Sequence, residues 1–179
     1  MNSVTERIEQ ASSQDVDKLE VLINSAYRGE SSKKGWTTEA DLLGGIRIDK
    51  KALEELILVD NSVILKFTEG SDLLGCVNLV SKEKAIYLGM LTVSPTEQQK
   101  GIGKKLITAS ENYARDADFE EIEMTVISKR PELIAYYERR GYQRTGEKRP
   151  FPMNDPRFGE PKTDLEFIVL RKIIKSPLL

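Results

Sequence analysis

The segment from residue 85 to residue 127 constrains the fold most, because its hydropathy pattern changes twice within a short stretch. Residues 85–93 form a nearly continuous run of apolar and β-branched side chains, which predicts a strand. Pro95 ends that strand, and a polar turn containing Gly101 and Gly103 leads into a helix over residues 102–116 with one apolar face. Residues 122–127 alternate between apolar and polar side chains, which predicts another strand. This order of elements predicts an α/β fold.

The glycine turn has the features of a phosphate site. The first N–H groups of a helix lack partners, and the helix dipole places positive charge at the same end. Lys100, Lys104 and Lys105 add further positive charge there. The turn lacks the hydroxyl residue of a magnesium-binding P-loop and the third glycine of a dinucleotide fingerprint. A diphosphate held without metal therefore fits best, although an ordinary basic connection between a strand and a helix would share the two glycines.

Two short motifs resemble those of a known family. The sequence Gln98-Gln-Lys-Gly-Ile-Gly103 is similar to a Gln/Arg-x-x-Gly-x-Gly/Ala signature that binds pyrophosphate. Downstream, Ala135-Tyr-Tyr-Glu-Arg-Arg-Gly-Tyr142 is similar to a helix that ends in Tyr-Glu-x-x-Gly-Phe/Tyr. Pro131 suits the start of this helix and Gly141 suits its end. Both motifs, in this order and spacing, resemble the GNAT superfamily of acetyl-CoA-dependent N-acetyltransferases.

The resemblance implies a GNAT fold, in which a central mixed, mostly antiparallel twisted sheet of about seven strands is flanked by helices. It implies acetyl-CoA as co-substrate and no metal. Leu91 and Val93 would offer main-chain groups to the pantetheine arm and the acetyl carbonyl, and the turn would hold the pyrophosphate. The implied cofactor-binding residues are Leu91, Val93, Gln98, Gln99, Lys100, Gly101, Ile102, Gly103 and Lys104.

The resemblance also implies a catalytic role for Tyr137, which precedes Glu138 in the second motif. A phenol with a pKa near 10 suits a group that protonates the departing thiolate. Packing in the core is the alternative role for this aromatic side chain. Arg130 departs from the family, which often has an asparagine at this position that serves the cofactor arm.

The composition of the chain excludes several other catalytic mechanisms and metal sites. The chain has no histidine and one cysteine, which excludes Ser-His-Asp and Cys-His catalysis and the usual zinc sites. Acetyl transfer needs neither residue, because the substrate supplies the amine and the thioester is already activated. No general base is assigned: residues 85–93 contain no carboxylate, and the position of Glu123 early in its strand is compatible with a solvent-facing side chain. The alternative is a water chain, with the carboxylate of Glu30, Glu39 or Asp41 helping to bind a cationic amine.

The acceptor substrate is expected to meet residues 27–41 and 149–158, which combine turn formers, aromatic residues and charges. Tyr27, Trp36 and Glu39 are the candidate substrate-binding residues, with Trp36 alternatively a hydrophobic anchor of its loop. Arg28, Arg47 and Arg157 could pair with a substrate carboxylate or be solvated. Amino acid-like, peptide and polyamine acceptors all remain open.

The rest of the chain predicts one domain over residues 1–179. Strands are expected at 4–10, 63–68, 73–80 and 165–172, helices at 38–43 and from Ser12 and Asp49, and a loop at 27–35. The net charge of −2 argues against nucleic acid as a partner. No membrane segment or signal peptide is visible. The single cysteine, Cys76, is expected to be buried in its strand and suits a reducing compartment, so a cytoplasmic protein is expected. A homodimer would be in keeping with the family.

Two classes of function follow from the sequence. The favoured one is an N-acetyltransferase that moves acetyl from acetyl-CoA to a primary amine of a small molecule by direct attack in a ternary complex. A protein or peptide acceptor is the alternative within this class. The second class is a non-catalytic acyl-CoA-binding module, which the missing carboxylate in residues 85–93 and Arg130 would allow.

Overall fold

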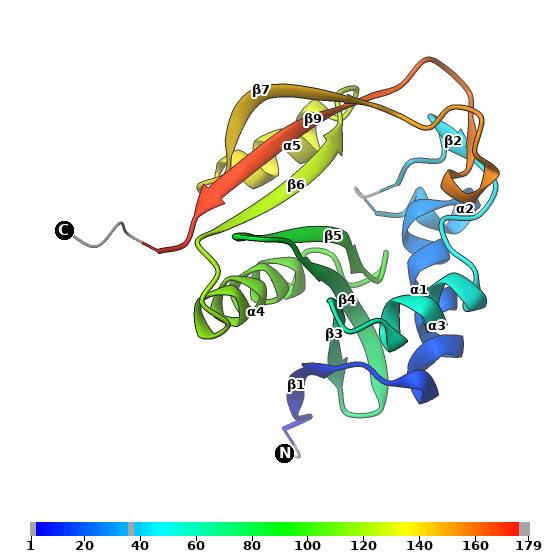
Figure 1. Cartoon of the computed structure of the whole chain (residues 1–179). Helices are drawn as coiled ribbons and strands as arrows, with labels where there is room; N and C mark the ends of the chain where they lie inside the picture. The colour runs from blue at the N-terminus through cyan, green and yellow to red at the C-terminus, as the bar shows by residue number, and fades with distance from the viewer. Residues whose placement is uncertain (1–2, 36–37, 176–179) are drawn as a thin grey trace.

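The computed structural model describes residues 3–35 and 38–175, which contain a mixed seven-stranded sheet in the order β1-β3-β4-β5-β6-β9-β7 (Figure 1). All neighbouring strands pair antiparallel except β5 and β6, which are parallel. The mostly antiparallel sheet predicted from the sequence is therefore confirmed. The strands of this sheet are β1 Glu6–Gln10, β3 Ser62–Glu69, β4 Asp72–Ser81, β5 Ala85–Val93, β6 Glu121–Ile127, β7 Gln143–Pro150 and β9 Glu166–Ile173.

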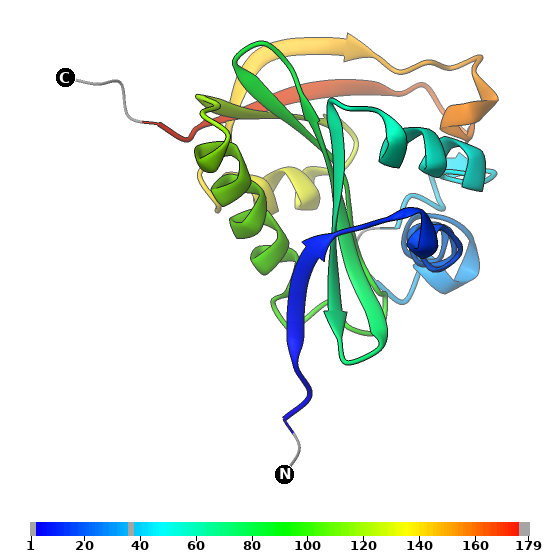
Figure 2. The same ribbon diagram turned by 60° about the horizontal axis from the view of Figure 1, so that its bottom comes forward.

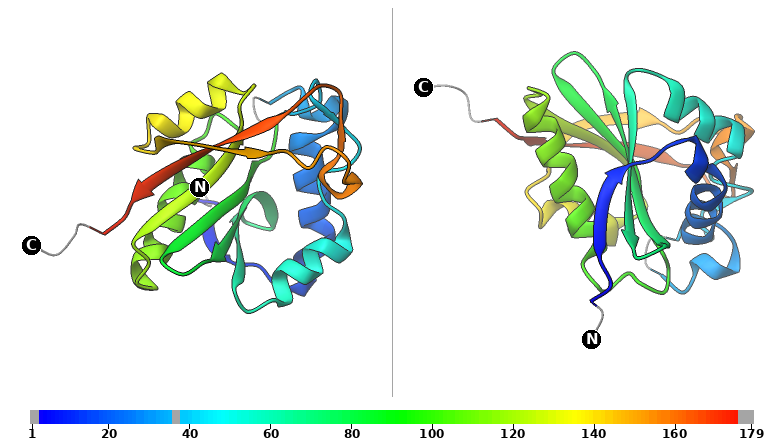
Figure 3. Two further views of the ribbon diagram at one scale, coloured as in Figure 1. Left: turned by 45° about the horizontal axis from the view of Figure 1, so that its top comes forward. Right: turned by 90° about the horizontal axis from the view of Figure 1, so that it is seen from below.

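Helices cover both faces of the sheet (Figures 2 and 3). The described helices are α1 Val16–Tyr27, α2 Gly29–Ser32, α3 Lys50–Leu58, α4 Ile102–Asp116 and α5 Pro131–Glu138, with 3-10 turns η1 Ser13–Asp15 and η2 Pro156–Phe158. Successive side chains of β3 lie on opposite faces of the sheet. Leu65 and Phe67 belong to the core under α4 and α5, whereas Ile64 packs with α1 and α3. Cys76 is fully buried with Ile64, in agreement with its predicted place in the core.

Residues at the ends of several helices and strands are those that the sequence predicted. The Asp49 side chain accepts a hydrogen bond of 2.8 Å from the Ala52 N–H and so caps α3, as predicted. Pro131 begins α5, and Gly141 follows it with a φ of 90°, a left-handed conformation that glycine adopts without strain. Strand β5 and helix α4 have the bounds expected from the sequence.

Two expectations of secondary structure were wrong, and one strand was not expected. The expected loop at 27–35 contains the short helix α2, and the expected helix at 38–43 is replaced by a turn and the two-residue strand β2 Leu43–Gly44. So short a segment gains little as an isolated helix, and β2 instead pairs with β8 Glu160–Pro161. Strand β7 was not expected, because its residues are almost all polar and exposed and show no alternation.

Strands β5 and β6 pair only at one end and then separate. Their register joins residues 85–87 to residues 121–123, and beyond that point the two strands diverge (Figure 1). Met90 has a φ of 54° where the pairing of β4 and β5 becomes irregular, a backbone conformation that is rare for a residue with a side chain. The bulge and the separation together open a fork between β5 and β6.

Residues 3–35 and 38–175 include no helix that combines the length and the apolar character needed to cross a bilayer.

Candidate active site

The glycine turn places the amino end of α4 close to the end of β5. Gly101 caps α4 with a φ of 78°, and a Cβ added there would meet no atom within 4 Å. In the part of the chain that the structure describes, the backbone N–H groups of Ile102, Gly103 and Lys104 donate to no other backbone group. These free donors at the positive end of a fifteen-residue helix form an anion-binding arrangement.

The three lysines of the turn are not equivalent. Lys100 forms an ion pair with Glu97, and Lys105 reaches Glu6 of β1 at 2.5 Å. Among the described residues, Lys104 is the lysine of this group without an ion pair. Excess positive charge at the turn therefore comes from Lys104 and the helix end.

Gln98 connects the turn to its surroundings, while Gln99 is exposed. The Gln98 Nε2 donates to the carbonyl of Val93 at 3.1 Å, and its side chain lies so close to Gly35 that a Cβ at position 35 would clash with it. A hollow beside the turn is lined by Lys34 and Gly35 as well as by residues 95–100. Sequence reasoning included Lys34 only in the acceptor segment 27–41 and did not place it beside the turn, because the two are distant in the chain.

Gly103 is required by a close approach. A Cβ at this position would lie 2.7 Å from the Tyr136 hydroxyl oxygen, so the absence of a side chain lets α5 pack against the start of α4. Arg140 lies over the Tyr136 ring, with its Cζ 3.4 Å from the ring centroid, and donates to the Tyr136 carbonyl. The two sequence motifs therefore meet in space.

A cavity of about 320 Å³ occupies the fork between β5 and β6. Leu91 and Met90 of β5, Thr125 of β6 and Tyr137 of α5 are among the residues that line it. Near the point where the strands separate, the Tyr87 hydroxyl and the Thr125 hydroxyl are 2.5 Å apart and bridge them. The fork thus encloses a space that borders the main chain of β5.

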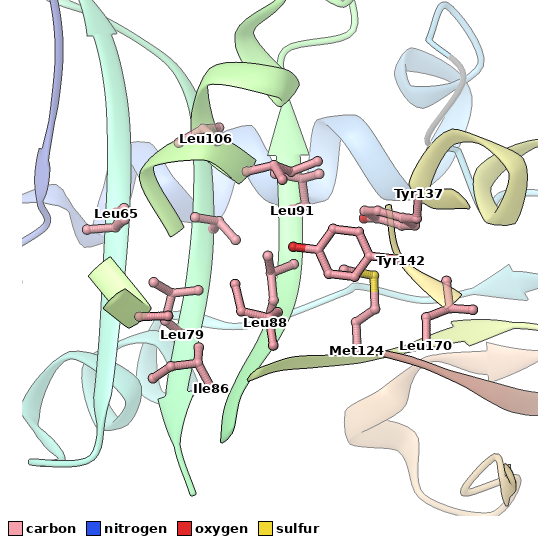
Figure 4. Packing of buried hydrophobic residues seen from close by; sticks show 14 of the residues in the cluster. Leu65, Leu79, Ile86, Leu88, Leu91, Leu106, Met124, Tyr137, Tyr142 and Leu170 are labelled. Carbon is pink, nitrogen blue, oxygen red and sulfur yellow. The ribbon is translucent and has the colours of Figure 1, made fainter. Parts of the chain in front are cut away.

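Tyr137 is buried in the core and also lines this cavity, so its position is compatible with both roles considered from the sequence, packing and catalysis. Figure 4 shows it in the core with Tyr142 and Leu91. Its ring contacts Tyr136 and Tyr142 edge to face, with centroids 5.4 and 6.0 Å away. No side chain or main-chain group in the described residues hydrogen-bonds the Tyr137 hydroxyl. Burial raises the pKa of Tyr137 well above 10, so the phenol stays protonated at neutral pH.

The proposed substrate-binding residues converge only in part. The Tyr27 hydroxyl donates to the Leu91 carbonyl, and Glu39 is held by the Arg28 guanidinium. Tyr27 and Glu39 both line the cavity. Trp36 lies outside the described residues.

The three candidate arginines separate into two groups. Arg28 is buried beside Glu39, and Arg47 lines the cavity with its Cζ 5.6 Å from the Tyr27 ring centroid. Arg157 is exposed and pairs with Asp155 at 2.6 Å. Only Arg28 and Arg47 therefore lie at the candidate site.

Arg130 is also brought to the cavity. It is 4% exposed, immediately precedes α5, and its Nε donates to Glu132 at 2.8 Å. A charged guanidinium thus stands at the position where the family often has asparagine.

Glu123 does not face solvent. Its carboxylate is buried, and it accepts hydrogen bonds of 2.8 Å from Arg149 on β7 and from Arg171 on β9. Burial by itself would raise its pKa, but the hydrogen bonds and charges of the two arginines outweigh burial and lower it. This environment is unfavourable for a general base, and it depends in part on Arg149 of the edge strand β7, which the sequence pattern did not predict.

Comparisons with known proteins agree with this geometry. Residues 39–152 match the family model described as an acetyltransferase (GNAT) domain. A comparison with curated protein sequences gives no match.

Solved structures share the fold at low sequence identity. An N-acetyltransferase from Staphylococcus aureus Mu50 has a TM-score of 0.73 at 12% identity, covering 95% of this chain and 98% of its own. The ribosomal-protein-S18-alanine N-acetyltransferase from Escherichia coli has a TM-score of 0.72 at 13% identity, with 97% and 96% covered. The PaiA N-acetyltransferase from Thermoplasma acidophilum, in complex with coenzyme A, has a TM-score of 0.68 at 17% identity, with 94% and 99% covered.

Proposed function

Because the chain belongs to the GNAT acetyltransferase family, we propose that it transfers the acetyl group of acetyl-CoA to a primary amine of a small molecule by direct attack in a ternary complex. The observation that carries this proposal is the cavity in the β5–β6 fork, which borders Leu91 and is lined by Tyr137. The complex of the Thermoplasma protein with coenzyme A supports the choice of cofactor.

In the proposed complex, the free N–H groups at the start of α4 and the Lys104 ammonium hold the pyrophosphate. The acetyl group lies in the fork beside the main chain of Leu91, where Tyr137 reaches the sulfur, and the pantetheine arm runs along β5 past Val93 toward the turn. The amine attacks the thioester carbonyl, the new C–N bond forms, and the C–S bond breaks. The thiolate takes a proton from the Tyr137 hydroxyl, and the amine loses a proton to water. Water then returns that proton to the Tyr137 oxygen, which restores the phenol for the next turnover.

The proposal is tested by calorimetric titration with acetyl-CoA in the absence of added metal, with free CoA and NADH as comparisons. We expect micromolar binding of acetyl-CoA and no binding of NADH. Thiol release with a panel of amines then separates an enzyme from a non-catalytic acyl-CoA-binding module, which would bind without releasing thiol. Lack of binding to acetyl-CoA would overturn the assignment of residues 98–104.

A further inference from the structure

A second, smaller cavity of about 60 Å³ lies against the first, and the two share Glu39, Arg47 and Phe158 among their lining residues. Arg28 also lines the smaller cavity, from the end of α1, while Arg47 comes from the segment between β2 and α3. The remaining wall is largely apolar and includes Phe151 and Phe167. Two guanidinium groups from separate elements therefore meet in an apolar recess beside the cavity in the fork.

One carboxylate faces these two cations. Arg28 is 5% exposed and bonds Glu39, yet its Nε is buried and has no hydrogen-bond partner among the described residues. Arg47 forms no ion pair with any described residue. Burial lowers the pKa of Arg28, Glu39 opposes that effect, and the charge of Arg47 lowers the pKa further. Arg28 therefore has a buried donor without a partner, and Arg47 adds a partly buried positive charge beside it, an arrangement that is costly unless an anion completes the site.

The recess has the size of a small planar anion. Its volume of about 60 Å³ is about that of two water molecules in the liquid. Tyr27 connects it to the fork, because its ring lies against Arg47 and its hydroxyl bonds the Leu91 carbonyl. An anion in the recess therefore lies beside the cavity in the fork, with which the recess shares Glu39, Arg47 and Phe158.

We infer that the acceptor amine carries a carboxylate, which binds between Arg28 and Arg47 while the amine reaches the fork. The inference rests on the proposed function and names its substrate class as an amino acid or a close analogue. Polyamines fit poorly, since Glu39 is the carboxylate that lines both cavities within the described residues and Arg28 already neutralises it.

The test measures thiol release with a set of α-amino acids, each compared with its own carboxamide, and with spermidine. We expect at least one amino acid to exceed its carboxamide in kcat/KM by about ten- to hundredfold, mainly through KM, because a charge-assisted hydrogen bond is lost in the amide. Arg47→Gln is expected to remove this preference, so that the ratio of kcat/KM for the amino acid to that for its carboxamide falls to about one. Arg157→Gln is the matched control, since that arginine is exposed and paired with Asp155, and it should keep the preference.

Failure of this inference can be distinguished from failure of acetyl transfer. If carboxamides or spermidine are accepted with the same efficiency as the amino acids, the carboxylate site is overturned while acetyl transfer stands. A preference for the amino acid that survives in Arg47→Gln leads to the same conclusion. If no amine releases thiol, calorimetry with N-acetylphenylalanine and its carboxamide tests the site directly. Binding of the acid alone, lost in Arg47→Gln, would support the site, whereas equal or absent binding of the acid would overturn it.

Discussion

The hydroxyl of Tyr27, the last residue of α1, donates a hydrogen bond to the main-chain carbonyl of Leu91 in β5. Both residues are buried and both line the cavity in the fork. This hydrogen bond connects α1 to β5, the strand beside which the acetyl group is proposed to bind. It therefore couples the segment proposed to bind the acceptor with the segment proposed to bind the cofactor.

Replacing Tyr27 by phenylalanine tests this connection. Tyr27→Phe leaves the buried Leu91 carbonyl without its side-chain partner, so we expect the free energy of unfolding to fall by about 1–3 kcal/mol. Urea unfolding measures the change. Tyr113→Phe serves as the control, because Tyr113 is a partly buried tyrosine of α4 that does not line the cavity. Equal stability of the wild type and Tyr27→Phe would show that the bond contributes nothing.

The proposed role of Tyr137 as proton donor predicts a selective loss of turnover. Tyr137→Phe keeps the ring contacts with Tyr136 and Tyr142 but removes the hydroxyl, so kcat should fall by about 10²- to 10⁴-fold. Acetyl-CoA affinity, measured by calorimetry, should stay within about twofold because the mutation spares the ground-state contacts. Turnover unchanged in this variant would exclude Tyr137 from the chemistry.

Charge at the glycine turn can be separated from backbone strain. Gly101 has a φ of 78° and open space around it, so Gly101→Glu and Gly101→Gln share the same conformational cost. Only the glutamate repels a diphosphate, and we expect Gly101→Glu to abolish acetyl-CoA binding in calorimetry while Gly101→Gln retains part of it. Similar losses in the two variants would argue against a diphosphate at this turn.

The contact between the two motifs predicts energetic coupling. Gly103→Ala places a methyl group 2.7 Å from the Tyr136 hydroxyl oxygen, and such overpacking costs about 1–3 kcal/mol of stability. Combination with Tyr136→Phe removes the clashing oxygen and should recover much of that loss. A double-mutant cycle of urea unfolding measures the coupling, and additive effects would contradict the close approach.

The lowered pKa of Glu123 predicts that the free energy of unfolding depends on pH. Its pKa is lowered in the folded state, so its contribution is complete above the unfolded value of about 4.5 and is lost as the pH falls through the lower folded value. The wild type should therefore lose more stability than Glu123→Gln when urea unfolding is compared at neutral pH and below pH 4. Parallel losses in the two proteins would show that Arg149 and Arg171 do not hold the carboxylate ionised.

Local sequence signals determined much of the central fold. Pro95, Gly101 and the apolar spacing that follows fixed the bounds of β5 and α4, because turns, caps and periodicity act between near neighbours. The alternation at 122–127 located β6 for the same reason. The motif resemblance pointed to the family, which the family model then confirmed.

The sequence by itself thus determined the order of strand, glycine turn, helix and strand, and with it the residues of the candidate cofactor site. Only the tertiary structure decided the place of β7, the environment of Glu123 and the recess that contains Arg28 and Arg47. Strand β7 is polar and gains its place only by pairing with β9, which in turn buries Glu123 between two arginines. Arg28 and Arg47 line one recess because the Asn24 side chain of α1 accepts hydrogen bonds from the main-chain N–H groups of Arg47 and Ile48. These arrangements depend on contacts between residues far apart in the chain. Such contacts produce no periodic pattern of hydropathy in the local sequence from which they could be predicted.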